Sequence, residues 1–382
     1  MMKNSKRMHL ASAFLVQFFF TAFYTIPQVY NLYIAEDFGL GLAEIGTLVM
    51  LQSLPSTIIP LLLGRAADKF GKKQMIVGGL VLYIVGGLMM VAAKTVGFYT
   101  AGLLINAVGI AMGYGSNGPA IADNFPDKAG RYISWIEASG CVAQTLVPLI
   151  AVAIGVTWRP MYLMVSVLAV IPMLLICFVR IPKYSSADPA NTGSNSRAKI
   201  TLSLFLLSFA MLFYCGMDAT YASFVDAFFV DQRNIATHGS IALTLHGALY
   251  AVSRFLTGLI KKGEKTVIRI CLAVSAASLG VILLIQNPDI DLIFCAVFSF
   301  FAAPVYPLYL AQAARDYPEN SAEASSLLMA GSGIGCAVMA WAVGFVGESA
   351  GMTAAMIMLI VSGVFSLLCY IISEAMGKNK KA

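Results

Sequence analysis

The sequence predicts an all-α polytopic membrane protein with twelve transmembrane helices in two pseudo-symmetric bundles of six. The 382-residue chain is 59% hydrophobic and only 12% charged, whereas soluble domains carry roughly 25% charged residues. Long apolar runs recur along the chain, and similar short motifs recur about half a chain length apart. The low charge excludes a soluble enzyme and a disordered or coiled-coil chain. The runs also disfavour a transmembrane β-barrel, whose strands alternate apolar and polar residues.

Six apolar runs in the first half are each long enough to cross a bilayer. A hydrocarbon core of ~30 Å needs about 20 helical residues at a rise of ~1.5 Å per residue. The first run lacks a clean cleavage site, so we expect a spanning helix rather than a signal peptide. The expected spans are 9–33, 42–63, 74–93, 97–121, 132–155 and 160–180.

A polar segment at 181–199 separates these six runs from six more. It is rich in Ser, Pro, Asn and Gly, which is typical of a flexible connector. We therefore expect an N-terminal bundle at 1–180, a cytoplasmic linker at 181–199 and a C-terminal bundle at 200–382. The later spans are expected at 200–229, 239–259, 267–286, 290–312, 322–345 and 352–374.

The positive charges predict how the chain is oriented in the membrane. If both termini are cytoplasmic, every Lys and Arg except Lys94, Arg159 and Arg233 lies on the cytoplasmic side. Short loops rich in Lys and Arg stay in the cytosol, and an odd number of spans would disrupt this partition. We therefore expect an integral protein of a plasma (bacterial inner) membrane, whose net charge of +6 reflects topology rather than nucleic-acid binding.

An internal repeat relates the two halves. Phe125 and the Pro-Asp after it, beyond the fourth span, match Tyr317 and the Pro-Glu after it, beyond the tenth. Gly64 and Gly258 close the second and eighth spans at nearly the same separation. Repeated bundles of this kind are typical of secondary transporters.

A basic, glycine-containing motif lies between the second and third spans. It reads Gly64-Arg-Ala-Ala-Asp68-Lys-Phe-Gly71-Lys72-Lys73. Its glycines permit a tight turn, and its acid can satisfy open backbone donors at a helix start. The motif resembles the G-x-x-x-D-[RK]-x-G-[RK]-[RK] loop of the major facilitator superfamily. That resemblance implies the superfamily's fold and a cytoplasmic gate in which this loop works with Asp123 and Arg131.

A narrower resemblance concerns the seventh span. Tyr214-Cys-Gly-Met-Asp218 is similar to the Y-x-G-x-[ED] helix pattern of fucose permease-like sugar–proton symporters. Asn117 and Glu137 lie where that branch has a helix-4 Asn and a polar helix-5 residue. The glycine string on helix 5 that is typical of drug antiporters is mostly missing here, which disfavours an exporter.

Ionisable residues inside the apolar runs are the candidates for proton coupling. A charge in hydrocarbon costs about 2.5–3.5 kcal/mol on insertion scales, so such residues need a reason to be there. Asp218 and Glu137 are harder to explain as packing than His246, which shares the depth of Asp218 across the hairpin of spans 7 and 8. In the repeat, Met329 occupies the position that corresponds to Glu137, and Gln28 occupies the position that corresponds to Asp218. A purely structural role would recur in both halves, so the asymmetry favours function.

Tyrosine and amide side chains within the spans form the expected solute-binding surface, although many of the aromatics are equally explained by packing. Amides beside aromatic faces suit a polyhydroxylated or small polar solute. The first span carries such residues at helical i, i+4, i+7 spacing. The candidates are Gln17, Tyr24, Gln28, Asn31, Asn106, Tyr114, Asn117, Gln144, Tyr214, Tyr221 and Tyr306.

These features predict a secondary active transporter that moves a small neutral or cationic polar solute by alternating access, coupled to protons. The substrate is not expected to be anionic, because no Lys lies inside a span. We expect a monomer in the lipid bilayer without nucleic-acid partner, cofactor, metal or enzymatic activity. Two alternatives remain open: a proton-driven exporter of multiple lipophilic drugs, and a membrane sensor or structural partner that does not transport.

Overall fold

The computed structural model of the chain describes residues 2–125, 129–179, 202–257, 260, 263–317 and 321–378. These residues form fourteen α-helices and no strand. The predicted all-α class is therefore confirmed. The predicted linker at 181–199 lies outside the described residues.

The chain divides into two compact units. The first comprises Met1–Phe38 and Leu51–Gly193, and the second comprises Gly39–Met50 and Ser194–Ala382. The segment Gly39–Met50 thus groups with the second unit, although the expected bundle boundary placed it in the first. Close backbone approach explains this, because a Cβ built on Gly46 would lie 2.5 Å from the carbonyl oxygen of Ala340.

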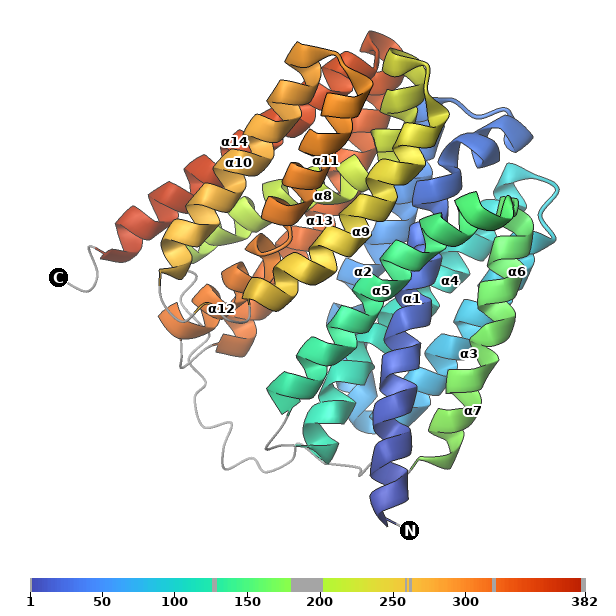
Figure 1. Cartoon of the computed structure of the whole chain (residues 1–382). Helices are drawn as coiled ribbons and strands as arrows, with labels where there is room; N and C mark the ends of the chain where they lie inside the picture. The colour runs from blue at the N-terminus through green and yellow to red at the C-terminus, as the bar shows by residue number, and fades with distance from the viewer. Residues whose placement is uncertain are drawn as a thin grey trace. The chain divides into compact units, whose positions relative to one another are not determined.

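The first unit is built on two pairs of long helices. α1 (Met2–Phe38) packs along α5 (Ala129–Ile154), and α3 (Lys72–Val91) packs along α4 (Val96–Asn124) (Figure 1). α1 continues beyond the expected end of the first span, so Asp37 lies in its last turn and not in a loop. There its carboxylate accepts hydrogen bonds from Trp158 Nε1 at 2.9 Å and Arg159 Nη1 at 2.7 Å.

The sixth span consists of two shorter helices, α6 (Trp158–Leu168) and α7 (Val170–Phe178). Pro172 has no backbone N–H, so the carbonyl of Leu168 loses its i+4 donor, and α6 ends there. Both pieces pack against α1 and α3.

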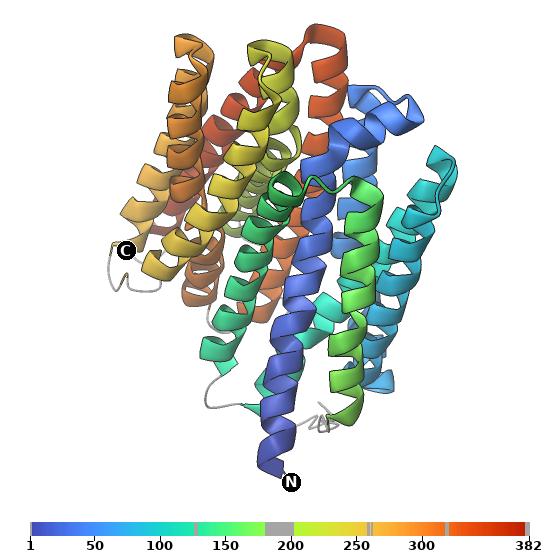
Figure 2. The same ribbon diagram turned by 45° about the vertical axis from the view of Figure 1, so that its right-hand side comes forward.

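The second unit is arranged around α8 (Leu202–Arg233), which packs against α13 (Ser321–Ala350) and α14 (Met352–Lys378). α10 (Glu264–Ile285) and α11 (Pro288–Ala302) run side by side, as their neighbouring orange ribbons in Figure 2 show. These pairings leave α9 and α12 to complete the unit.

α9 (Ala236–Thr257) packs against α8 and α11. α12 (Val305–Asp316) continues the tenth span after a break at Ala303 and Pro304. By length and composition, eleven helical segments of the described chain can cross a membrane. α9 is also 22 residues long, but its histidines and Arg254 lower its hydropathy.

Helix pairing within the two units follows one scheme. When each broken span is counted as one, the first unit pairs its first span with its fourth, fifth and sixth, its third with its fourth and sixth, and its fourth with its fifth. The second unit repeats all six of these pairings among its own spans. This recurrence supports the internal repeat read from the sequence.

Glycines allow α3 and α4 to pack backbone against backbone. A Cβ built on Gly79 would lie 2.6 Å from the carbonyl oxygen of Gly109, and one built on Gly86 would lie 2.5 Å from that of Gly102. No larger residue fits at these points without moving a helix.

The structure corrects the expected loop at 64–73. α2 (Leu42–Phe70) extends through Gly64 and Asp68, and α3 begins at Lys72, so Gly71 alone lies between the helices. Gly71 has a φ of 95°, which favours glycine. Of the other proposed gate residues, Asp123 lies in α4 and Arg131 in α5. The side chains of Asp68, Asp123 and Arg131 lie outside what the structure describes.

Lys73 closes a helix end in the first unit. Its Nζ donates to the carbonyl oxygens of Cys177 at 2.6 Å and Val179 at 2.8 Å. These carbonyls lie at the C-terminal end of α7, where the backbone leaves acceptors without intrahelical donors.

Candidate functional site

Glu137 is the acid at the centre of a polar cluster in the first unit. It lies on α5, half-buried, and its carboxylate accepts hydrogen bonds from Gln17 Nε2 on α1 at 3.2 Å and Tyr114 OH on α4 at 3.1 Å. Three helices therefore bring predicted residues to one place. Tyr114 keeps 37% of its surface exposed, so the cluster lies at the edge of the helix core.

Two predicted solute-binding amides instead hold helices together. Asn106 is buried and donates to the carbonyl oxygen of Tyr83 on α3 at 2.7 Å. Asn117 is buried and donates to the carbonyl oxygen of Ala13 on α1 at 3.1 Å. Removing such an amide would leave a buried backbone carbonyl without a donor, which would lower the stability of the fold.

The remaining candidates of the first unit lie near the helix interiors. Tyr24 OH and Ser53 Oγ are hydrogen-bonded at 2.8 Å. Gln28 and Asn31 are buried on α1, and Gln144 is half-buried on α5.

Asp218 is the acid of a second cluster, in the second unit. It lies half-buried on α8, and Tyr250 OH on α9 donates to its Oδ1. Tyr250 OH lies 3.4 Å from Tyr214 OH, and Tyr214 OH in turn donates to the carbonyl oxygen of Ala302 at 2.9 Å. Tyr250 was not among the predicted residues, although its spacing of four from His246 puts both on one face of α9.

His246 lies beside this cluster without a direct hydrogen bond to Asp218. It is buried, and its Nδ1 is 3.0 Å from Ser299 Oγ on α11. Its ring lies tilted against aromatic neighbours, with centroids 4.3 Å from Tyr250 and 5.6 Å from Tyr221. These contacts are those of a packed histidine.

The aromatic and cationic residues around Asp218 complete the second cluster. Arg254 lies over the Tyr250 ring, with its Cζ 5.1 Å from the centroid. Tyr221 is fully buried against Phe298, with ring centroids 4.3 Å apart. The remaining predicted residue of this unit, Tyr306, is half-buried on α12.

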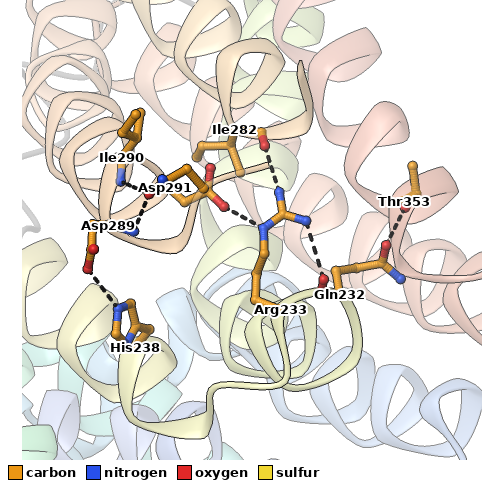
Figure 3. Close-up of polar contacts among 9 residues, drawn as sticks. Gln232, Arg233, His238, Ile282, Asp289, Ile290, Asp291 and Thr353 are labelled. Atoms are coloured by element: carbon orange, nitrogen blue, oxygen red, sulfur yellow. Dashed lines mark hydrogen bonds and ion pairs between the residues drawn. The ribbon is translucent and has the colours of Figure 1, made fainter. Parts of the chain in front are cut away.

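A third, purely structural cluster joins the ends of α8, α10 and α11 (Figure 3). Arg233 Nε lies 2.6 Å from Asp291 Oδ2, and Arg233 Nη2 donates to the carbonyl oxygen of Ile282 at 2.9 Å. The exposed fractions of the two charged side chains are 8% and 0%. Water therefore cannot solvate either charge if its partner is removed. At the same end, His238 lies 3.4 Å from Asp289, and Thr353 donates to Gln232 at 2.8 Å.

Comparison with known families explains this arrangement of paired bundles. The family described as the Major Facilitator Superfamily matches residues 13–236 and 206–381. The chain belongs to the major facilitator superfamily. This facilitator is therefore an integral membrane protein of that superfamily.

Curated relatives of this facilitator are distant. It is 20% identical over 148 residues to "Multidrug resistance protein MdtL" of Escherichia coli O81 (strain ED1a), covering 38% of each chain. It is 24% identical over 181 residues to the protein of the same name from Klebsiella pneumoniae (strain 342), covering 46% of each. The matched part thus spans less than half the length of these relatives.

Solved structures share the fold over nearly the whole chain. The nucleoside transporter NupG, in a mutant form, matches at 15% identity with a TM-score of 0.78, over 97% of this chain and 99% of that one. A D-xylose–proton symporter matches at 15% identity with a TM-score of 0.77, over 94% and 96%. The facilitator FucP in its outward conformation matches at 16% identity with a TM-score of 0.69, over 97% and 99%. These likenesses confirm the facilitator fold.

Proposed function

We propose that this facilitator is a secondary active transporter that couples movement of a small neutral or cationic polar solute to protons by alternating access. The observation that carries the proposal is a hydrogen-bonded acid on a helix in each unit. Glu137 accepts from an amide and a hydroxyl, and Asp218 accepts from a hydroxyl. An acid held this way can bind and release a proton, and the same donors can bind a hydroxylated solute. The solved sugar and nucleoside transporters of the same fold make such solutes the first to test.

The test begins with identification of a solute. A thermal-shift screen of purified protein with D-xylose, uridine, amino acids and cationic drugs selects the ligand, and proteoliposomes then measure its transport. We expect wild-type protein to concentrate the ligand under an inward pH gradient and to exchange it without a gradient.

Two neutralising variants then locate the coupled proton. Asp218→Asn should lose concentrative uptake and keep counterflow, because exchange needs no net proton movement. Glu137→Gln should behave identically if it shares the proton, and otherwise should weaken solute affinity. The matched control is Asp231→Asn, an exposed acid on the same helix α8, which should concentrate solute normally. If both interior variants also do so, neither acid carries the proton.

The charge of the solute has its own test. A carrier of dianions should place cations at the membrane midplane. The two clusters described above instead contain the acids Glu137 and Asp218, which would repel an anionic solute. Saturable uptake of oxalate or phosphate that requires Arg254 would overturn the proposal of a neutral or cationic solute.

We also propose that Asp68, Asp123 and Arg131 act at a cytoplasmic gate together with Gly64, Gly71, Lys72 and Lys73. Asp68→Asn should slow exchange and leave ligand binding near wild type, because a cytoplasmic gate controls reorientation rather than solute affinity. Loss of binding with normal turnover would contradict the gate. We further propose that the protein is a monomer in a bacterial inner membrane, with both termini in the cytosol.

Export of lipophilic drugs is the second candidate function, and the similarity to MdtL proteins favours it. It predicts that cells expressing the protein accumulate less ethidium, and that inverted vesicles take ethidium up when acidified inside. Uptake of D-xylose or uridine without any effect on ethidium would exclude it.

A further inference from the structure

Two tyrosine side chains connect Asp218 to a break in the tenth span. Tyr250 OH donates to the Asp218 carboxylate, and Tyr214 OH donates to the carbonyl oxygen of Ala302. A tyrosine hydroxyl has one proton to donate and lone pairs to accept with. Both protons are thus already used. The two hydroxyl oxygens, 3.4 Å apart, share no hydrogen while the acid is ionised.

A proton on Asp218 reverses the first part of this chain. The carboxyl group then becomes a donor to Tyr250 OH, which frees the Tyr250 proton to point at Tyr214 OH. Tyr214 keeps its donation to Ala302. The result is a continuous chain of donors in one direction, and hydrogen bonds in such chains strengthen one another.

The receiving end of the chain is a place where the helix is interrupted. Ala302 is the last residue of α11, and Ala303 and Pro304 separate it from α12. Pro304 cannot donate to the carbonyl of Phe300, and Ser253 Oγ on α9 does so instead at 2.6 Å. Side chains of α8 and α9 therefore provide the hydrogen bonds that hold this break.

We infer that Tyr250 and Tyr214 form a relay that reports the protonation state of Asp218 to the α11–α12 break. Both are positioning residues: they act on the backbone of the tenth span through their hydroxyl groups. The relay serves transport if Asp218 carries the coupled proton, and in that respect it rests on the proposed function.

The other titratable and charged groups around Asp218 come from several elements. α9 contributes Arg254 and His246, α8 contributes Cys215 and Tyr221, and α13 contributes Cys336. α11 contributes Ser299, which is bonded to His246. The charges at the cytoplasmic ends of α12 and α14 pair elsewhere, Arg315 with Glu264, Asp316 with Lys265 and Glu374 with Arg269.

The relay predicts that removing its two hydroxyls shifts the protonation midpoint of Asp218 in opposite directions. Tyr250→Phe removes a donor from the ionised carboxylate, and a bond to a charged acceptor is stronger than one to a neutral partner. In Tyr250→Phe, Asp218 should therefore stay protonated to a higher pH than in the wild-type protein. Tyr214→Phe leaves that donor in place and removes the acceptor that Tyr250 needs when Asp218 is protonated, so protonation should require lower pH. Each shift should be about 0.5–1 pH unit, the equivalent of one hydrogen bond.

The experiment is an infrared titration of the purified full-length protein, which follows the C=O band of protonated carboxyl groups. Subtraction of the Asp218→Asn spectrum assigns the band of this acid. Tyr370→Phe is the matched control, because this buried tyrosine of the same unit donates to Gln312 at 2.7 Å and should leave the midpoint unchanged. Shifts of the two relay variants in the same direction, no shift in either, or a band that survives in Asp218→Asn would overturn the relay.

A second readout addresses the break itself. The amide introduced by Asp218→Asn donates to Tyr250 as the protonated acid does, so backbone hydrogen exchange over 299–310 should slow relative to wild type at alkaline pH. Adding Tyr214→Phe should abolish that protection, and equal exchange in all three proteins would contradict the inference. Neither readout needs a transported solute. Opposite titration shifts without proton-driven uptake would uphold the relay and reject the proposed function.

Discussion

Lys73 joins the third and sixth spans through one side chain. Its Nζ donates to two carbonyls at the end of α7, where a cation also complements the helix dipole. Lys73→Met should therefore lower stability by about 1–2 kcal/mol, measured as a lower melting temperature in detergent. Lys94→Met, at an exposed lysine, is the control and should melt as wild type. Equal melting of the two variants would contradict the cap.

Arg233 and Asp291 form the buried ion pair of the second unit. Arg233→Met leaves a buried carboxylate uncompensated, which should cost about 3–5 kcal/mol. Replacing both, as Arg233→Met with Asp291→Leu, should recover most of that loss. His238→Gln should cost less than about 1 kcal/mol, because its partner Asp289 is 91% exposed. Unfolding of these three variants and of the single Asp291→Leu variant in denaturant measures the differences. Additive losses in the double variant would argue against a coupled pair.

The acids of the candidate site could be predicted from the sequence, whereas an uncharged residue such as Tyr250 could not. Glu137 and Asp218 stand out because acids are rare in apolar runs, and both are hydrogen-bonded by side chains from neighbouring helices. Tyr250 escaped prediction because tyrosine is common in such helices. The signal available was its position one turn after His246 and one turn before Arg254 on α9.

At the scale of the helix, small residues decide how closely α3 and α4 approach. Gly79→Leu should destabilise the first unit by more than about 1–3 kcal/mol, the usual cost of overpacking, because its Cβ alone meets the backbone of α4. Gly280→Ala is the control, since no heavy atom lies within 4 Å of its Cβ position. The control should be neutral or stabilising. The measurement is thermal unfolding, and similar melting of both variants would show that the crossing tolerates side chains.

Helix interruptions could not be located from prolines alone. Pro27, Pro119 and Pro148 lie inside continuous helices, whereas the tenth span is broken at Pro304. The difference lies in the partners: Ser253 and Tyr214 from other helices supply hydrogen bonds at the break. Those partners are distant in sequence, so the break depends on tertiary contacts. Similarly, the motif at 64–73 was read as a loop because of its glycines, but its first part continues α2.

At the scale of the whole molecule, the class and the repeat followed from hydropathy and motif spacing, because a bilayer imposes span length directly. The same reasoning predicts orientation. In intact cells, a membrane-impermeant maleimide should label Asp289→Cys from outside and should not label Lys6→Cys until the membrane is opened. Both side chains are exposed, so access depends on sidedness. The reverse pattern would place the termini outside.

Asn106 and Asn117 constrain how a protein of this design can change its selectivity over evolution. Each is committed to a backbone carbonyl of a neighbouring helix, so a lineage that altered either one would first have to survive weaker helix contacts. Gln17 and Tyr114 instead both donate to the side chain of Glu137, so a change at one of these three positions can be compensated at another. New specificities should therefore arise through joint substitution of these three positions, while the two asparagines persist among descendants that transport different solutes.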